Sequence, residues 1–209
     1  MQFNSNRFGI PEVTRNIIAI NVLLFVATIY SGDTMYEYLA LFNYKSNYFH
    51  GWQMITHMFM HGSFTHLLFN MFGLYMFGSR LEQMWGAKRY INFYLITGLG
   101  AALLHTLVQD YEITQGLVNI NQPTVGASGA LFGILVAFAM YWPNTQLFLM
   151  FIPVPIKAKW AVIGYAAFEL FAGISGFQAG VAHFAHLGGA LFGFILVQYW
   201  NKNNRNSFY

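Results

Sequence analysis

The sequence contains no cysteine and very little charge. Of its 209 residues, 10 are Lys or Arg and 7 are Asp or Glu, which is 8% against about 25% in typical globular proteins. The absence of cysteine excludes a disulfide-stabilised secreted scaffold, and a hydrophobic content of 56% excludes intrinsic disorder. The net charge of +3 is too small and too dispersed for a nucleic-acid-binding protein. So few polar groups cannot cover a soluble domain, and the composition therefore predicts a surface that faces lipid.

What the sequence has instead is long segments almost free of charge. A helix needs about 20 apolar residues to cross a hydrocarbon layer roughly 30 Å thick. Lipid cannot satisfy free backbone groups, which favours helices, and the alternation of a membrane β-barrel is absent. We therefore expect an all-α, polytopic membrane protein, a bundle of six transmembrane helices at about 16–31, 56–79, 89–108, 127–142, 158–174 and 181–200. The whole chain, 1–209, is predicted to be one membrane domain, with an N-terminal segment 1–15, a core 16–200 and a tail 201–209.

The charges between these segments predict the orientation of the chain. Nine cations fall on the side of the two termini: Arg7, Arg15, Arg80, Lys88, Arg89, Lys157, Lys159, Lys202 and Arg205. The opposite side has one cation, Lys45. Because positive charge is enriched in cytoplasmic loops, both termini are expected in the cytoplasm. The segment 32–55, on the outer side, is rich in Tyr, Phe and Trp, so it is expected to lie in the membrane interface between the first two helices.

Polar side chains inside the spans are costly and indicate function. Ser128, His186 and His66 each lie about 14 residues before the predicted inner end of their helix. At 1.5 Å per residue, all three are roughly 21 Å above the cytoplasmic boundary. A hydroxyl and two imidazoles are therefore expected in one layer near the outer face.

Small residues surround the serine and one of the histidines. Ser128 lies in the run Gly126-Ala127-Ser128-Gly129-Ala130. On the last helix, Gly189 and Gly193 follow His186. Such faces let helices pack closely, which would bring His186 within hydrogen-bond reach of Ser128 as a general base. The free N–H groups at the start of the fourth helix could stabilise an oxyanion. Each feature alone is more often structural, but their coincidence at one depth favours a catalytic site.

A Ser–His–Asp triad would need a third member. Asp110 and Glu112 are predicted in an outer loop, and Glu169 near the outer end of the fifth helix. None is evidently placed to orient His186, so the sequence predicts a catalytic dyad of Ser128 and His186.

Four other polar residues form two pairs with helical spacing. His66 and Asn70 share a face and could donate hydrogen bonds to one oxyanion. His57 and His61 have a spacing that suits a metal. On one straight helix they would face away from His66, and no cysteine or supporting carboxylate accompanies them. We therefore predict no metal site and interpret them as packing or loop-anchoring residues. Two further histidines are interpreted as residues near the outer interface: His105 and His183.

These motifs together resemble those of the rhomboid family of intramembrane serine proteases. The matching positions are His66 and Asn70, the run Gly126-Ala127-Ser128-Gly129, the run Ala185-His186-Leu187-Gly188-Gly189, Gly193, and Glu82, Gly86 and Arg89. The resemblance implies a six-helix fold with a membrane-embedded outer loop. It implies that Ser128 is the nucleophile, His186 the general base, and His66, Asn70 and the Ser128 N–H the oxyanion hole. Phe132 matches an aromatic position that packs on the catalytic histidine, and Gln53 stands where relatives often carry Arg.

The resemblance implies cleavage of transmembrane segments of other membrane proteins near their outer end, without a cofactor. The expected partners are these substrates and the lipid bilayer, with no nucleic acid and no required oligomer. A plasma membrane of bacterial type is the expected location. Two alternatives stay open at this point: a catalytically silent rhomboid-like protein that binds client helices, and a small transporter. A transporter is disfavoured because it would need a path of charged residues through the bilayer, and Glu169 is the only carboxylate or cation inside the predicted spans.

Overall fold

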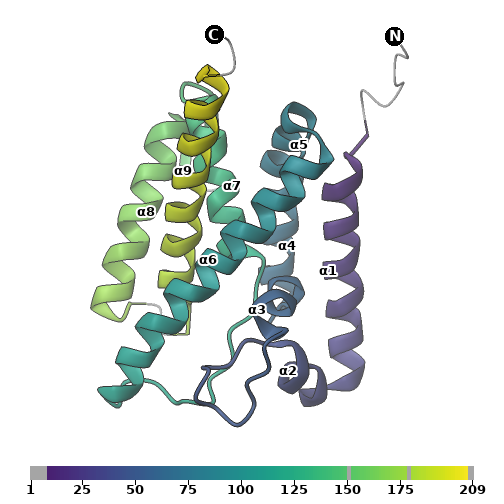
Figure 1. Ribbon diagram of the computed structural model, residues 1–209, viewed down its shortest axis with the longest axis vertical. Coiled ribbons are helices and arrows are strands. Elements are labelled where there is room, and N and C mark those ends of the chain that lie inside the picture. Colours follow the sequence, from purple (N-terminus) through teal and green to yellow (C-terminus); the bar gives the residue numbers. More distant parts are fainter. Residues whose placement is uncertain (1–8, 150–151, 178–179, 207–209) are drawn as a thin grey trace.

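A computed structural model describes residues 9–149, 152–177 and 180–206, and this part of the chain is mostly helical. Its long helices lie side by side along the longest axis of the molecule (Figure 1). α1 begins and α9 ends at the same end of the molecule, as expected for an even number of crossings. Arg7 and the outermost parts of both predicted tails, 1–8 and 207–209, lie outside the described residues.

The predicted helices correspond closely to observed ones. The elements in chain order are α1 (Glu12–Ser31), α2 (Asp33–Leu39), α3 (Gln53–Thr56), the 3₁₀ turn η1 (His57–Phe59), α4 (Phe64–Gly73), the π-helical turn η2 (Leu74–Gly78), α5 (Ser79–Trp85), α6 (Ala87–Thr114), α7 (Ser128–Tyr141), β1 (Gln146–Leu149), β2 (Ile152–Lys157), α8 (Ala158–Ser175) and α9 (His183–Asn206). α1, α6, α7, α8 and α9 match five of the predicted segments to within about two turns.

The prediction of one continuous second helix over 56–79 is wrong, because the chain is not helical between η1 and α4. The chain forms η1, leaves helical geometry, and starts a new helix at α4. Ser63 caps this helix, because its Oγ accepts a hydrogen bond of 3.1 Å from the backbone N–H of His66. α4 then continues through η2 into α5. His57 and His61 therefore precede the long helix instead of belonging to it.

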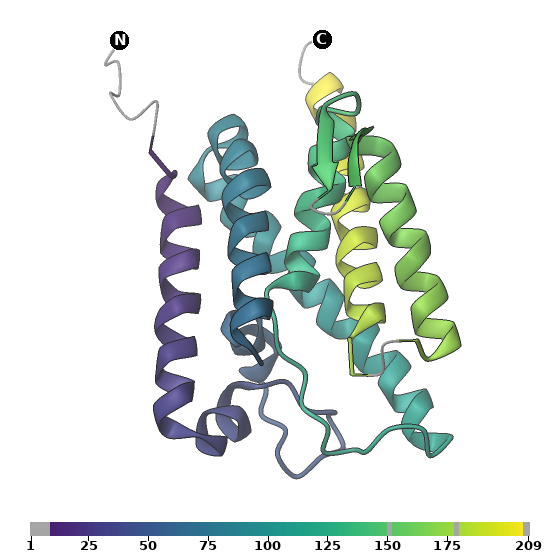
Figure 2. The same cartoon turned by 180° about the vertical axis from the view of Figure 1, so that it is seen from behind.

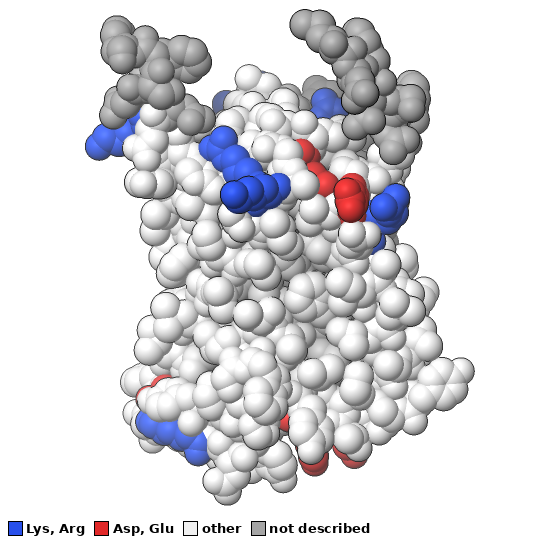
Figure 3. Space-filling model, turned by 45° about the vertical axis from the view of Figure 1, so that its right-hand side comes forward, with Lys and Arg blue, Asp and Glu red and all other residues white. Residues whose placement is uncertain are grey.

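Two of the described helices, α1 and α6, are long and apolar enough to cross a bilayer by length and composition. α7 is apolar but has only 14 residues, or about 21 Å at 1.5 Å per residue. That is shorter than a hydrocarbon layer of roughly 30 Å. On the face drawn in Figure 3, charged residues gather at the two ends of the molecule and an uncharged band lies between them.

α9 packs against α7 through glycines, which we call the glycine seam: Gly129 and Gly133 of α7 with Gly189 and Gly193 of α9. A methyl group on Gly193 would lie 2.9 Å from the carbonyl oxygen of Gly133, and one on Gly189 would overlap the Gly129 carbonyl. Gly188 faces α6 in the same way, with 3.0 Å from a methyl position to the carbonyl oxygen of Gly100. The predicted close packing of small-residue faces is confirmed.

The expectation of an all-α fold is wrong between α7 and α8. β1 and β2 form an antiparallel hairpin there, with Gln146 opposite Lys157 and Leu147 opposite Ile156 (Figure 2). Its Leu, Ile, Val and Phe residues favour a strand over a loop, and Pro155 disfavours a helix.

The outer connection between α1 and α4 is ordered around one amide side chain. Gln53 is fully buried. Its Nε2 donates to the carbonyls of Glu37 and Tyr48, both at 2.9 Å, and its Oε1 accepts from the His50 N–H at 3.1 Å. Gln53 therefore anchors this loop. Four aromatic side chains of the loop are exposed, as an interfacial segment requires: Tyr38, Tyr44, Tyr48 and Trp52.

Candidate active site

Ser128 is the first residue of α7, where the chain enters the helix from an irregular segment. Gly126 precedes it with φ of 134°, a conformation that favours glycine, and its N–H donates to the carbonyl of His57 at 2.9 Å. A methyl group at Gly126 would lie 2.9 Å from Nε2 of His66 and 3.3 Å from Oγ of Ser128. The glycine thus leaves open the space between the serine, the histidine and the free N–H groups at the start of α7.

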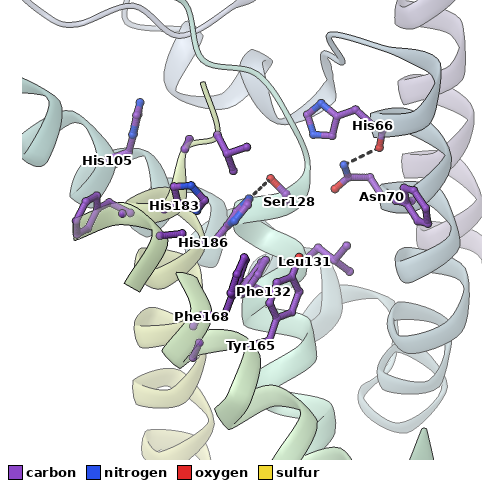
Figure 4. A pocket seen from close by; sticks show the side chains of 18 of the residues that line it. His66, Asn70, His105, Ser128, Leu131, Phe132, Tyr165, Phe168, His183 and His186 are labelled. Atoms are coloured by element: carbon purple, nitrogen blue, oxygen red, sulfur yellow. Dashed lines mark hydrogen bonds between the residues drawn. The ribbon is translucent and has the colours of Figure 1, made fainter. Parts of the chain in front are cut away.

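His186 contacts Ser128 across the glycine seam. Its Nε2 lies 2.8 Å from Oγ of Ser128 (Figure 4). Phe132, one turn further along α7, stacks on the imidazole with ring centroids 4.4 Å apart and an angle of 6° between the planes. Close backbone packing brings the two polar groups together, and the phenyl ring limits rotation of the imidazole.

His66 and Asn70 lie on α4, facing Ser128 from the other side of the site (Figure 4). Nδ2 of Asn70 donates to the carbonyl of His66 at 2.9 Å, and its Oδ1 is buried without a hydrogen-bond partner. One N–H of this amide is therefore used within its own helix, and the second is free for another acceptor. The ring of His66 borders the space beside Gly126, and Asn70 lines the same cleft one turn further along α4.

All of the predicted site residues except Gly126 line one cleft of about 1900 Å³. Ser128, His66 and Asn70 lie in its wall together with Phe132 and His186. The cleft runs between α4 and α7 on one side and α8 on the other, and it extends towards the hairpin, whose Leu147 and Ile156 also line it. Apolar walls with a few convergent polar groups are typical of a binding site.

The expectation that no carboxylate lies near His186 is wrong. Glu169 of α8 is only 2% exposed, and its Oε2 lies 2.9 Å from Nδ1 of His186. The two atoms are within ion-pair distance, but Nδ1 of His186 does not meet the geometry of a hydrogen bond to this oxygen. The signal in the sequence was a single acid inside an apolar span. The sequence did not show which face of α8 packs against α9, so it could not show that Glu169 reaches His186.

His183 is buried within the protein, since it is only 6% exposed, and it contacts the same carboxylate. Its Nδ1 lies 2.7 Å from Oε2 of Glu169, and its Nε2 lies 3.1 Å from the carbonyl oxygen of Phe177. His105 is also inside the molecule, with Nε2 at 2.7 Å from Oγ1 of Thr124.

The pair predicted as packing or loop-anchoring residues lies on the other side of the cleft. Nδ1 of His57 lies 2.8 Å from the carbonyl oxygen of Gln53, in the loop that Gln53 anchors. The ring of His61 stands edge-on to that of His66, with centroids 4.9 Å apart. His61 and His66 therefore meet, which a single straight helix would have prevented.

Comparison with known proteins places this site in a family. The family described as Rhomboid domain matches residues 48–202. The chain is 31% identical over 160 residues to Rhomboid protease AarA of Providencia stuartii, covering 69% of this chain and 54% of that protein. It is 31% identical over 147 residues to Rhomboid protease GluP of Bacillus subtilis, covering 68% and 27%, respectively. Rhomboid protein 1, mitochondrial, of Saccharomyces cerevisiae is 32% identical over 149 residues, covering 71% and 42%.

The chain belongs to the rhomboid family. It spans about half or less of the length of the three relatives named. The matched region begins within the outer loop and includes the cleft with all of its polar residues.

Proposed function

We propose that this protein is an intramembrane serine endopeptidase that cleaves transmembrane segments of other membrane proteins near their outer end. The observation that carries the proposal is the contact of 2.8 Å between Nε2 of His186 and Oγ of Ser128 in the wall of a large cleft. Two similar proteins are named rhomboid proteases, which supports the same activity.

In this mechanism, Nε2 of His186 takes the proton of Ser128, and Oγ attacks a peptide carbonyl of the substrate. The imidazolium then donates its proton to the leaving amine, and a water molecule hydrolyses the acyl-enzyme with the same histidine as base. Phe132 keeps the imidazole plane in place during both transfers. Ser128 is half-buried, so water entering the cleft can reach the ester.

The oxyanion would form in the space that Gly126 leaves open. The N–H of Ser128 and the positive end of α7 face this space. A ring nitrogen of His66 borders it from α4, and the free N–H of Asn70, one turn along the same helix, would supply a further donor. Donors arranged in advance around a developing charge supply one of the largest contributions to catalysis.

We assign six membrane crossings to α1, the continuous α4–η2–α5 segment, α6, α7, α8 and α9. The short length of α7 agrees with this assignment, because Ser128 would then begin its helix about 9 Å below the outer boundary. The irregular segment before it is satisfied by protein, since Thr124 and Leu41 exchange backbone hydrogen bonds of 2.8 and 2.9 Å. Both termini would lie in the cytoplasm, on the side with most cations.

The substrate must offer an accessible carbonyl to Ser128. A transmembrane helix hides its carbonyls in hydrogen bonds to the N–H groups four residues later. Segments with glycine, proline or other helix-destabilising residues near their outer end should therefore be cleaved faster.

The proposal is tested with a fluorophosphonate probe and a transmembrane reporter substrate. Wild-type protein should be labelled at Ser128 and cleave the reporter. Ser128→Ala should fold normally, lose labelling and lose cleavage by at least about a thousandfold. Full cleavage by Ser128→Ala would show that Ser128 is not the nucleophile. A wild-type protein that binds transmembrane peptides and is neither labelled nor active would instead support the catalytically silent alternative.

A further inference from the structure

Glu169 is a buried acid that the proposed Ser–His mechanism does not use. Its carboxylate lies between two imidazoles of α9, 2.7 Å from Nδ1 of His183 and 2.9 Å from Nδ1 of His186. An isolated carboxylate inside an apolar span is costly. Its position therefore needs a compensating partner, and the two histidines are the groups that supply one.

The tautomer of His186 points to a role for this carboxylate. If Nε2 accepts the proton of Ser128, then the ring N–H must be on Nδ1 in the resting enzyme. Oε2 of Glu169 is the acceptor within 2.9 Å of that atom. The alignment of this contact is poor, although its length is within the range of a hydrogen bond.

His183 determines how much charge Glu169 carries. Nε2 of His183 faces the carbonyl oxygen of Phe177, which can only accept, so this nitrogen holds a proton. The contact between Nδ1 and Oε2 of Glu169 then requires one more proton, on either atom. Whichever atom holds it, Glu169 and His183 together are neutral, which explains how the acid tolerates burial.

We propose that Glu169 is a positioning residue for His186 and that His183 controls its charge by sharing a proton with it. Glu169 holds the Nδ1–H tautomer of His186 and stabilises the imidazolium that forms when His186 takes the Ser128 proton. The proton shared by Oε2 of Glu169 and Nδ1 of His183 stays within this pair. When it moves from the acid to the imidazole, one O–H bond is broken and one N–H bond is formed. This inference rests on the proposed protease activity.

Glu169→Gln removes the charge and keeps the shape of the side chain. The expected result is a kcat about tenfold to a hundredfold lower with KM unchanged, since the aligned triads of other serine proteases lose more when the acid becomes an amide. Glu169→Asp should recover part of the loss. Glu82→Gln is the matched control, because it changes another buried glutamate that lies far from the cleft, against the start of α1. Once its rate is divided by the amount of Ser128 that reacts with the probe, Glu82→Gln should have the kcat of the wild type.

The pH dependence of kcat separates positioning from packing. Glu169→Gln removes the carboxylate oxygen that stabilises the imidazolium of His186, so the acid limb should move to lower pH. His183→Gln removes the shared proton, leaves Glu169 more negative, and should move the acid limb to higher pH. Other titratable groups face these residues from α8, α6 and α4, namely Tyr165, His105 and His66. They are unchanged in all variants, so opposite shifts report on the Glu169–His183 pair.

Both measurements use the full chain in lipid vesicles, with rates divided by the amount of Ser128 that reacts with the probe. Opposite pH shifts with a lower kcat in Glu169→Gln support the inference. Equal kcat and equal pH profiles in Glu169→Gln and wild type, with labelling intact, would overturn it and leave the protease proposal standing. Absence of wild-type labelling at Ser128 would overturn both.

Discussion

Two of the helices that pack against α9, α7 and α8, differ in how closely their backbones approach it. On one side, α7 meets α9 along the glycine seam, where a methyl group at Gly193 would lie 2.9 Å from a carbonyl oxygen. Towards α8, a methyl position on Gly173 meets only side-chain atoms of α9, the nearest in the ring of Phe184 at 2.9 Å, and Gly164 has no atom within 4 Å of its methyl position. The backbone contact with α7 determines the distance between Ser128 and His186. The side-chain contact with α8 borders the cleft.

The largest expected effect is a substitution within the seam. Gly189→Ala puts a methyl group into the Gly129 carbonyl and forces α9 away from α7. Overpacking of this kind should lower the free energy of unfolding by about 3 kcal/mol or more, and the separated Ser128 should no longer react with the probe. Thermal unfolding in detergent and labelling measure the two losses.

Gly164→Ala is the matched control for the seam. The same methyl group meets open space on α8, and alanine favours a helix by about 1 kcal/mol over glycine. This variant should be as stable as the wild type or slightly more stable. Equal loss of stability in the two variants would contradict the contrast drawn between α7 and α8.

The next effect concerns α1, which is held by polar contacts instead of close backbone packing. Glu82 accepts hydrogen bonds from the N–H of Val13 at 2.9 Å and from the N–H and Oγ1 of Thr14, both at 2.7 Å. Glu82→Gln should cost about 2 kcal/mol, because hydrogen bonds to a charged group are lost at a helix N-terminus. Chemical unfolding of the purified protein measures this change. A loss as large as that of Gly189→Ala would show that caps matter as much as the seam.

The smallest effect is expected at the outer surface, where Nζ of Lys45 lies 2.6 Å from Oδ1 of Asp110. The hydrogen bond from Lys45 lowers the pKa of Asp110, and the same contact raises the pKa of Lys45. The contribution of Asp110 to the free energy of unfolding is fully present above its ordinary pKa of about 3.9. It is lost as the pH falls through the lowered pKa of the folded protein. The Lys45 contribution is present below about 10.4 and is lost as pH rises through the raised value.

Between these limits the ion pair is constant. The difference in thermal midpoint between wild type and Asp110→Asn should therefore be small and unchanged from about pH 5 to 9, and it should vanish at lower pH. High salt should reduce it as well. A difference that grows on acidification would contradict the assignment of this pair.

Much of the helical framework could be predicted because it depends on local pattern. Charged residues and turn signals together predict the ends of α1, α6, α7, α8 and α9 to within about two turns. The break before α4 was missed although Ser63, a typical N-cap residue, stood at the right place. The charge-free run continued through it and concealed the boundary. The hairpin of β1 and β2 was not predicted, because the segment between the fourth and fifth predicted helices was treated as a loop.

The sequence by itself determined that the chain is a mostly helical member of the rhomboid family, and which polar residues stand at one depth in its helices. Helical periodicity and charge are local properties, so they can be read along the chain. Only the tertiary structure decided that Glu169 of α8 reaches both His183 and His186 of α9, and that His61 meets His66. Contacts between helices depend on how each helix is rotated about its axis, and packing against all neighbours sets that rotation.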